Sequence, residues 1–155
     1  MAKLADYELP PWVLDWIEDF LTDRKQQLKL AHDCYSDWGT VRAGVLQGTK
    51  LGPWLFLVMI NDIHDNGVNL WKYVNDTSMA KTVHKGQTSG IQAAVDDLVR
   101  QAKMDKFQLN ETKCKELQIS FSKSVDLFNA VTINHKPIEV VTSMKLLGLT
   151  ISHNL

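Results

Sequence analysis

The sequence predicts an α+β fold in which a largely antiparallel sheet packs on helices. Apolar residues recur at helical spacing in three segments, and shorter segments between them alternate or end at turn residues. Their order is helix, strand pair, helix, hairpin, helix and then strands, which is typical of the α+β class. The 155 residues suit one domain with a sizeable core.

The first predicted helix begins near Pro10, because Pro10 and Pro11 suit a first helical turn. Its apolar residues recur at helical spacing: Leu9, Trp12, Val13, Trp16, Ile17, Phe20 and Leu21. We therefore expect Trp12 and Trp16 to pack in the core, although tryptophan can also stack on bases. We also expect Trp38, Trp54 and Trp71 to be buried.

Two short strands are predicted next, at 27–31 and 39–43, around a loop at 33–37. A second helix is predicted from Thr49 to Ile60, with Pro53 in its first turn. Its residues are apolar on all sides, so it should be buried.

Residues 70–83 predict a hairpin, with a tight turn at Asn75 and Asp76 because Asx residues tolerate left-handed backbone. Ser89 followed by Gln92 predicts a capping box at the start of a third helix. That helix has one apolar stripe, formed by Ile91, Ala94, Val95, Leu98, Val99 and Ala102.

The C-terminal part predicts further strands. Leu117, Ile119 and Phe121 alternate as one strand, residues 131–133 and 138–141 form a hairpin, and a last strand covers 145–151. No linker to a second domain is evident.

Composition limits the function classes. With 45% hydrophobic and 23% charged residues, the chain is an ordinary globular protein rather than a disordered one. No segment approaches the roughly 20 apolar residues of a membrane span, so no membrane partner is expected. Cys34 and Cys114 lack paired spacing and are predicted to be free thiols in a reducing, intracellular compartment, cytoplasm or nucleus.

Charge is unevenly distributed although the net charge is only −1. Residues 1–70 hold 6 Lys and Arg against 10 Asp and Glu, a difference of −4. Residues 71–155 hold 11 against 8, a difference of +3. Any contact with a polyanion is therefore expected in the second half.

Two motifs carry a family resemblance. One is Tyr73-Val74-Asn75-Asp76 between apolar stretches, and the other matches G-x-P-Q-G-x-x-L-x-P-x-L-F with Leu46 in place of the first proline. The matched positions are Gly44, Gln47, Gly48, Leu51, Pro53, Leu55 and Phe56. Their order and spacing resemble the reverse transcriptase palm of LINE-type, non-long-terminal-repeat retrotransposons. Segments 16–25, 107–113 and 145–151 extend the resemblance over residues 5–152, as one partial reverse transcriptase domain.

The resemblance implies roles for individual residues in RNA-directed DNA polymerisation. The positions of Asn75 and Asp76 correspond to ligands of the family's Mg²⁺ ions, and Lys113 to a lysine that protonates pyrophosphate. Gln47, Gly48 and Tyr73 correspond to the template and nucleotide contacts. Lys145 precedes a primer-supporting hairpin whose turn holds Leu147 and Gly148.

The sequence departs from the family at the metal site. The family's hairpin has Asp where this chain has Asn75, and Mg²⁺ prefers carboxylate oxygens. The family's first catalytic strand, with its other aspartate, is missing from the nine residues before Pro10. We therefore expect a chain that holds no Mg²⁺ tightly, with Asp76 as its one weak ligand, and that is inactive alone.

Alternative interpretations remain open. Asn75 and Asp76 can be only a hairpin turn, Gln47 and Gly48 turn residues before a helix, and Lys113 a solvated lysine. The chain can be a module that binds RNA or an RNA–DNA hybrid through lysines: Lys72, Lys81, Lys85, Lys106, Lys113, Lys115 and Lys145. It can also be a protein-interaction fragment that self-associates through exposed palm surface.

Overall fold

The structure is a computed structural model that describes residues 1–41, 44–45, 48–64, 67–121 and 128–154. The chain divides into two compact units, Met1–Asp62 and Ile63–Leu155. Each unit has its own cluster of buried apolar side chains, so each is described by itself.

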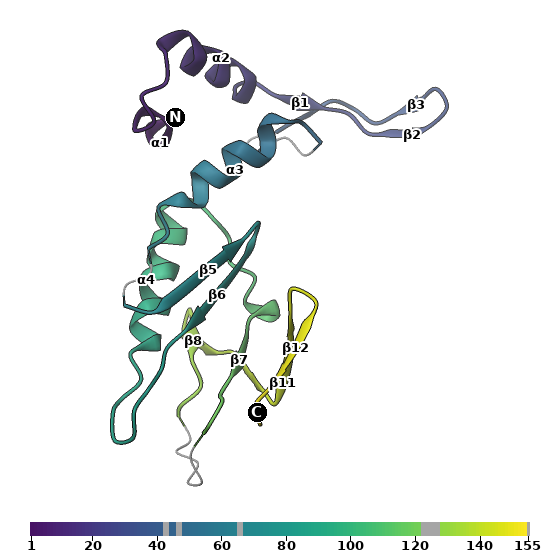
Figure 1. The fold of residues 1–155 in the computed structure, drawn as a ribbon. Coiled ribbons are helices and arrows are strands. Elements are labelled where there is room, and N and C mark those ends of the chain that lie inside the picture. The colour runs from purple at the N-terminus through teal and green to yellow at the C-terminus, as the bar shows by residue number, and fades with distance from the viewer. Residues whose placement is uncertain (42–43, 46–47, 65–66, 122–127, 155) are drawn as a thin grey trace. The chain divides into compact units, whose positions relative to one another are not determined.

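Three helices belong to the first unit (Figure 1): α1 (Ala2–Ala5), which the sequence did not predict, α2 (Pro11–Leu21) and α3 (Leu51–Asn61). The two predicted helices are confirmed to within about two residues at their ends. The Gly52 amide of α3 donates to Thr49 Oγ1 at 3.0 Å, which satisfies one of the free amides of the first turn.

The core of the first unit contains Leu4, Ile17 and Leu55, one from each helix. The prediction that Trp12 and Trp16 pack in this core is wrong, because their exposures are 72% and 55%. At 3.6 residues per turn, Ile17 takes the buried side of α2. The two tryptophans lie on the solvent side, so the predicted apolar stripe was too wide.

The other tryptophans were also predicted to be buried, and this is wrong as well. Trp38, Trp54 and Trp71 are 66%, 68% and 56% exposed. The apolar helix α3 buries Gly52 and Leu55 but leaves Trp54 on its outer side. An all-round apolar sequence therefore does not produce an all-round buried helix in this chain.

The strands of the first unit form one long hairpin of two ladders. β1 (Lys25–Gln26) pairs with β4 (Gly39–Thr40), and β2 (Lys29–Ala31) pairs with β3 (Cys34–Tyr35), both antiparallel. The predicted strand pair is present, but the predicted loop 33–37 contains β3. The predicted end of the second strand, 42–43, lies outside the described residues.

The second unit begins with the hairpin of β5 (Asn69–Tyr73) and β6 (Asp76–Ala80). Tyr73 pairs with Asp76, so the connecting residues are Val74 and Asn75. The hairpin is confirmed, but its turn lies one residue earlier than predicted because Asp76 takes part in the ladder.

Helix α4 (Ile91–Met104) follows and buries Ala94, Val95 and Ala102 from the predicted stripe. The predicted capping box is wrong, since Gln92 points to another partner. Its Nε2 donates to the Thr132 carbonyl at 2.9 Å, and its Oε1 accepts from the Thr132 amide at 2.8 Å. Gln92 thus connects α4 to a strand 40 residues away.

Replacing Gln92 by alanine is expected to lower the free energy of unfolding by about 1 to 3 kcal/mol, because it leaves both half-buried backbone groups of Thr132 without their partner. Urea denaturation measures this. The matched control is Gln87→Ala, at an exposed loop glutamine, which should change stability by less than about 0.5 kcal/mol. Equal effects of the two changes would contradict the assigned role of Gln92.

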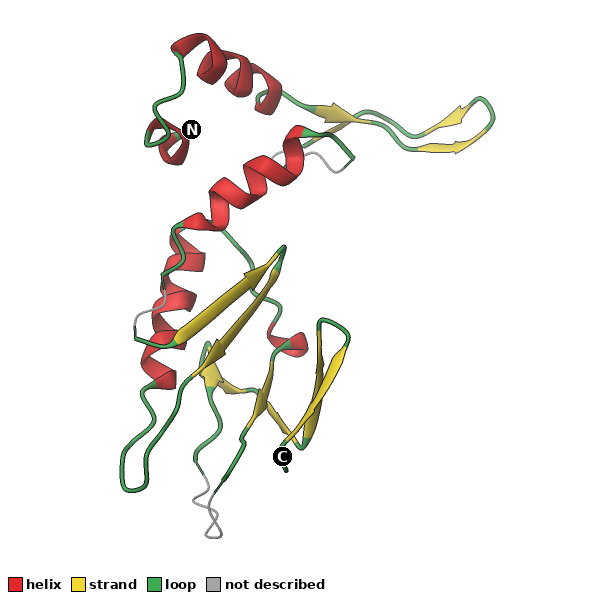
Figure 2. Cartoon of the chain, in the orientation of Figure 1, coloured by secondary structure: helices red, strands yellow, loops and turns green. Residues whose placement is uncertain are grey.

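The remaining elements of the second unit are short. They are η1 (Glu111–Lys113), β7 (Lys115–Leu117), β8 (Thr132–Ile133), β9 (Lys136–Pro137), β10 (Glu139–Val141), β11 (Ser143–Leu146) and β12 (Leu149–Ser152). These strands, yellow in Figure 2, form separate two-stranded pairs rather than one sheet. Within the described residues, five of the six pairs are antiparallel, as predicted, and β7–β10 is parallel.

Three strand predictions in this region need correction. The hairpin predicted from 131–133 and 138–141 is replaced by β8–β9, and β10 pairs with β7 instead. The predicted strand through Ile119 and Phe121 ends at Leu117, and Phe121 is 85% exposed. The predicted single last strand is a hairpin, β11–β12.

Val95, Val131 and Ile133 form the core of the second unit, with Met79 of β6 packed against them. This cluster decides which side of the β5–β6 hairpin is buried. None of the helices in the described ranges is both long and apolar enough to span a membrane.

Candidate nucleic-acid interface

The β5–β6 hairpin has one face toward the core and one toward solvent. Met79 packs on the core and pairs with Leu70, so these two side chains share the inner face. Side chains alternate along a strand, which places Trp71, Tyr73 and Asp76 together on the outer face. Trp71 and Tyr73 are 56% and 60% exposed. Their aromatic rings are thus available to a ligand.

The turn of this hairpin has unusual backbone. Val74 has a φ of +51°, whereas Asn75 has no positive φ. Left-handed backbone is unfavourable for a β-branched residue, by roughly 1 to 3 kcal/mol. The two-residue turn of Val74 and Asn75 places Tyr73 opposite Asp76 at the end of the ladder.

Asp76 is the one carboxylate of the hairpin, residues 69–80. In the part of the chain that the structure describes, no three His, Cys, Asp or Glu side chains are grouped so that they could hold a metal ion. Two Mg²⁺ ions need several converging carboxylates, and Asp76 beside the neutral Asn75 does not provide such a donor set. The expectation of weak Mg²⁺ binding stays a prediction.

The lysines predicted to contact nucleic acid fall into two groups. Lys72 donates to the Ile63 carbonyl at 3.2 Å, Lys81 donates to the Gly67 carbonyl, and Lys115 pairs with Glu139 at 3.3 Å. The other four are exposed, and their side chains make no hydrogen bond or ion pair with the described residues: Lys85, Lys106, Lys113 and Lys145. These four can approach phosphates without losing an existing contact.

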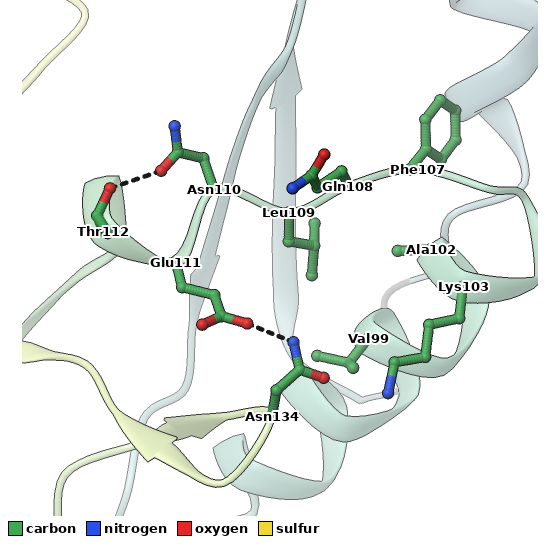
Figure 3. A pocket seen from close by; sticks show the side chains of 10 residues that line it. All are labelled: Val99, Ala102, Lys103, Phe107, Gln108, Leu109, Asn110, Glu111, Thr112 and Asn134. Carbon is green, nitrogen blue, oxygen red and sulfur yellow. Dashed lines mark hydrogen bonds between the residues drawn. The ribbon is translucent and has the colours of Figure 1, made fainter. Parts of the chain in front are cut away.

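The segment 107–113 lines a pocket of about 720 Å³ beside α4 (Figure 3). Val99, Ala102 and Leu109 supply apolar surface, and Lys103 lies at one side. Glu111 accepts a hydrogen bond from Asn134 across the pocket. Lys113 follows at the end of η1 but does not line the pocket.

Cys114 directly follows this segment, and the pKa of its thiol is shifted. Burial raises the pKa of the Cys114 thiol above its ordinary value, and the neighbouring Glu111 carboxylate raises it further. Its Sγ lies 3.4 Å from the Asn110 carbonyl. Cys34, in contrast, is exposed, and both cysteines are free, as predicted.

The raised pKa of Cys114 makes stability depend on pH. The unfolded thiol ionises near its ordinary pKa, about 8.5. Above that pH the folded chain retains its proton while the unfolded chain releases one, so the free energy of unfolding falls until the folded pKa is passed. We expect Cys114→Ala to remove this fall in urea denaturation between about pH 7 and pH 10, and Cys34→Ala to retain it. A fall of the same size in both variants would contradict the assignment.

The predicted primer-supporting hairpin is β11–β12. Lys145 pairs with Thr150, and Leu147 and Gly148 form the turn with φ values of +47° and +92°. Two positive φ values are typical of the type I′ turn that fits a two-residue hairpin. The turn at Leu147 and Gly148 is therefore confirmed, and its contact with a primer stays a prediction.

The Gly-rich motif belongs to the first unit. Gly48 is exposed with a φ of +83°, which favours glycine there. Arg24 holds the neighbouring segment by donating from Nη2 to the Gly44 carbonyl at 2.7 Å. Gln47 lies outside the described residues.

The sequence prediction missed two features of the second unit. Trp71 was expected in the core, although its position two residues before Tyr73 on a strand already predicts that the two share a face. Gln92 was read as a helix cap, and no local pattern points to its contact with Thr132. Only the fold brings those residues together.

Comparison with known proteins agrees with the motifs. The chain is 26% identical, over 159 aligned residues, to "RNA-directed DNA polymerase from mobile element jockey" of Drosophila melanogaster. The alignment covers 94% of this chain and 17% of that protein. No family model matches the chain, and no solved structure matches it. The similarity supports a distant relationship to the reverse transcriptases of mobile elements.

Proposed function

We propose that this chain is a reverse transcriptase-like, palm-derived segment that binds RNA, or an RNA–DNA hybrid with unpaired bases, and that adds no nucleotides itself. The observation that carries the proposal is the outer face of the β5–β6 hairpin. Trp71 and Tyr73 are both exposed there, and Tyr73 belongs to the motif that resembles the catalytic hairpin of the family.

Physical chemistry supports binding at this face. Bases stack on exposed aromatic rings with a gain of about 1 to 3 kcal/mol each, and stacking needs unpaired bases. The exposed lysines of the same unit supply phosphate contacts: Lys85, Lys106, Lys113 and Lys145. If all four bind a single strand, log Kd should change with log salt with a slope of about 3.

Asn75 supports the absence of polymerisation. An amide oxygen replaces the carboxylate that the family uses as a metal ligand, and Asp76 retains a single charge at this point. Losing one metal ligand of this kind removes several kcal/mol of transition-state stabilisation, or about three decades of rate. We place the binding function inside the cell, in cytoplasm or nucleus.

The test measures binding and synthesis on the same sample. Fluorescence anisotropy of a labelled RNA–DNA hybrid with a single-stranded RNA overhang should show saturable binding that weakens with salt, and a blunt hybrid should bind less. Primer extension with Mg²⁺ should give no product. Absence of binding by folded, monodisperse protein would refute the binding function, and nucleotide incorporation would refute the predicted inactivity.

The second candidate is a protein-interaction fragment. The first unit favours it, because large apolar side chains are exposed on its helices and hairpin: Trp12, Trp16, Leu28, Leu30, Trp38 and Trp54. Exposed apolar surface promotes association.

A further inference from the structure

One face of α2 takes no part in the proposed nucleic-acid binding. Trp12, Asp15, Trp16 and Asp19 are all exposed and lie within one side of the 11-residue helix, opposite the buried Ile17. We call these four residues the α2 face. It combines two large aromatic rings with two carboxylates that make no hydrogen bond or ion pair with the rest of the described chain.

The α2 face has the composition of a protein-binding surface. Tryptophan is highly buried on average, and exposures of 72% and 55% for Trp12 and Trp16 are unusual. Tryptophan is also enriched among residues that dominate binding energy at protein interfaces. The flanking Asp15 and Asp19 select a partner with positive charge.

The pocket beside α4 has the complementary properties. Its volume of about 720 Å³ lies within the range that holds drug-sized molecules, about 300 to 1,000 Å³, so an indole ring can enter it. Val99, Ala102 and Leu109 offer the ring apolar surface.

The charge around this pocket is positive toward solvent. Lys103 lines the pocket, and the exposed Lys106 follows the helix end. Glu111, the one carboxylate in the lining, is bound by Asn134 and lies 3.7 Å from Lys136. The carboxylates of the α2 face would therefore meet uncompensated lysines.

We propose that the chain associates head to tail, with the α2 face of one copy docked on the α4 pocket of a second copy. The charges disfavour a symmetric contact between two α2 faces, because that would bring four carboxylates together. The formal charges of the two units have opposite signs, as a contact between one unit and the other unit of a second copy requires. Met1–Asp62 holds 6 Lys and Arg against 9 Asp and Glu, and Ile63–Leu155 holds 11 against 9. Such a heterologous contact leaves a free site at each end, so further copies can add.

Complementation between two variants of the full chain tests the proposal. One variant carries Trp12→Ala and Trp16→Ala, and the other carries Lys103→Glu and Lys106→Glu, all at exposed positions. Sedimentation velocity should show each variant alone as a monomer across the micromolar range. An equimolar mixture keeps one intact contact and should form a 1:1 dimer that does not grow.

The wild-type chain should grow in mass with concentration, and this growth should decline when salt rises from about 0.1 M to about 1 M, which shortens the Debye length from about 10 Å to about 3 Å. The control Trp38→Ala removes an exposed tryptophan outside the α2 face and should associate like the wild type. A monomeric wild type, or association without dimer formation in the mixture, would overturn the proposal.

Discussion

Replacing Trp71 and Tyr73 together by alanine is expected to weaken binding of an RNA overhang by about 30-fold or more. Each ring contributes about 1 to 3 kcal/mol by stacking on a base, and 1.4 kcal/mol corresponds to a tenfold change in affinity. Both side chains are exposed on the outer face of the hairpin, so little core packing is lost. Fluorescence anisotropy at fixed salt measures the change in Kd.

Two controls separate stacking from a general loss of folding or charge. The pair Trp71→Phe and Tyr73→Phe retains the rings and should recover most of the affinity. Trp38→Ala removes an equally exposed tryptophan from the first unit and should leave Kd unchanged. If the double alanine variant bound like the wild type, the assignment of the interface to these two rings would be wrong. Binding would then come from the salt-dependent lysine contacts, which do not need the rings.

Replacing Ile133 by alanine is expected to lower the free energy of unfolding by about 2 to 5 kcal/mol, because it leaves a cavity in the core of the second unit. Ile133 is 6% exposed and packs with Val95 and Val131. A loss of this size is a large share of the 5 to 15 kcal/mol that stabilises an ordinary domain. Urea denaturation gives the size of the effect, and hydrogen exchange should show faster exchange of the α4 amides.

The matched control for this variant is Leu149→Ala in β12. Leu149 also lies on a strand of the second unit, but it is 73% exposed. Its replacement should change stability by less than about 0.5 kcal/mol. Comparable losses for the two variants would mean that the buried cluster around Ile133 does not stabilise the unit.

Local patterns predicted the three longer helices, the β5–β6 hairpin and the turn at Leu147 and Gly148. The stripe along Ile91–Met104 and the Gly148 turn depend on contacts within a few residues, which the sequence displays directly. The resemblance of Tyr73–Asp76 and the Gly-rich motif to reverse transcriptases likewise needed no coordinates, and the similarity to a mobile-element polymerase agrees with it.

Contacts between distant segments could not be predicted in this way. Glu139–Val141 was assigned to a local hairpin, whereas it pairs in parallel with Lys115–Leu117. Gln92 was assigned to its own helix end, whereas it binds the backbone of Thr132. In both cases the nearby partner was chemically acceptable, and a more distant one was preferred once the chain had folded.

The sequence by itself determined where the three longer helices and the β5–β6 hairpin form and which motif carries the family resemblance, because these depend on local backbone preference and side-chain period. Only the tertiary structure decided which apolar side chains are buried. Trp12, Trp16 and Trp71 are large apolar residues, yet Ile17 and Met79 pack on the cores and leave the tryptophans on the opposite faces. Burial depends on which side of an element meets its neighbour, and that side is set by long-range packing.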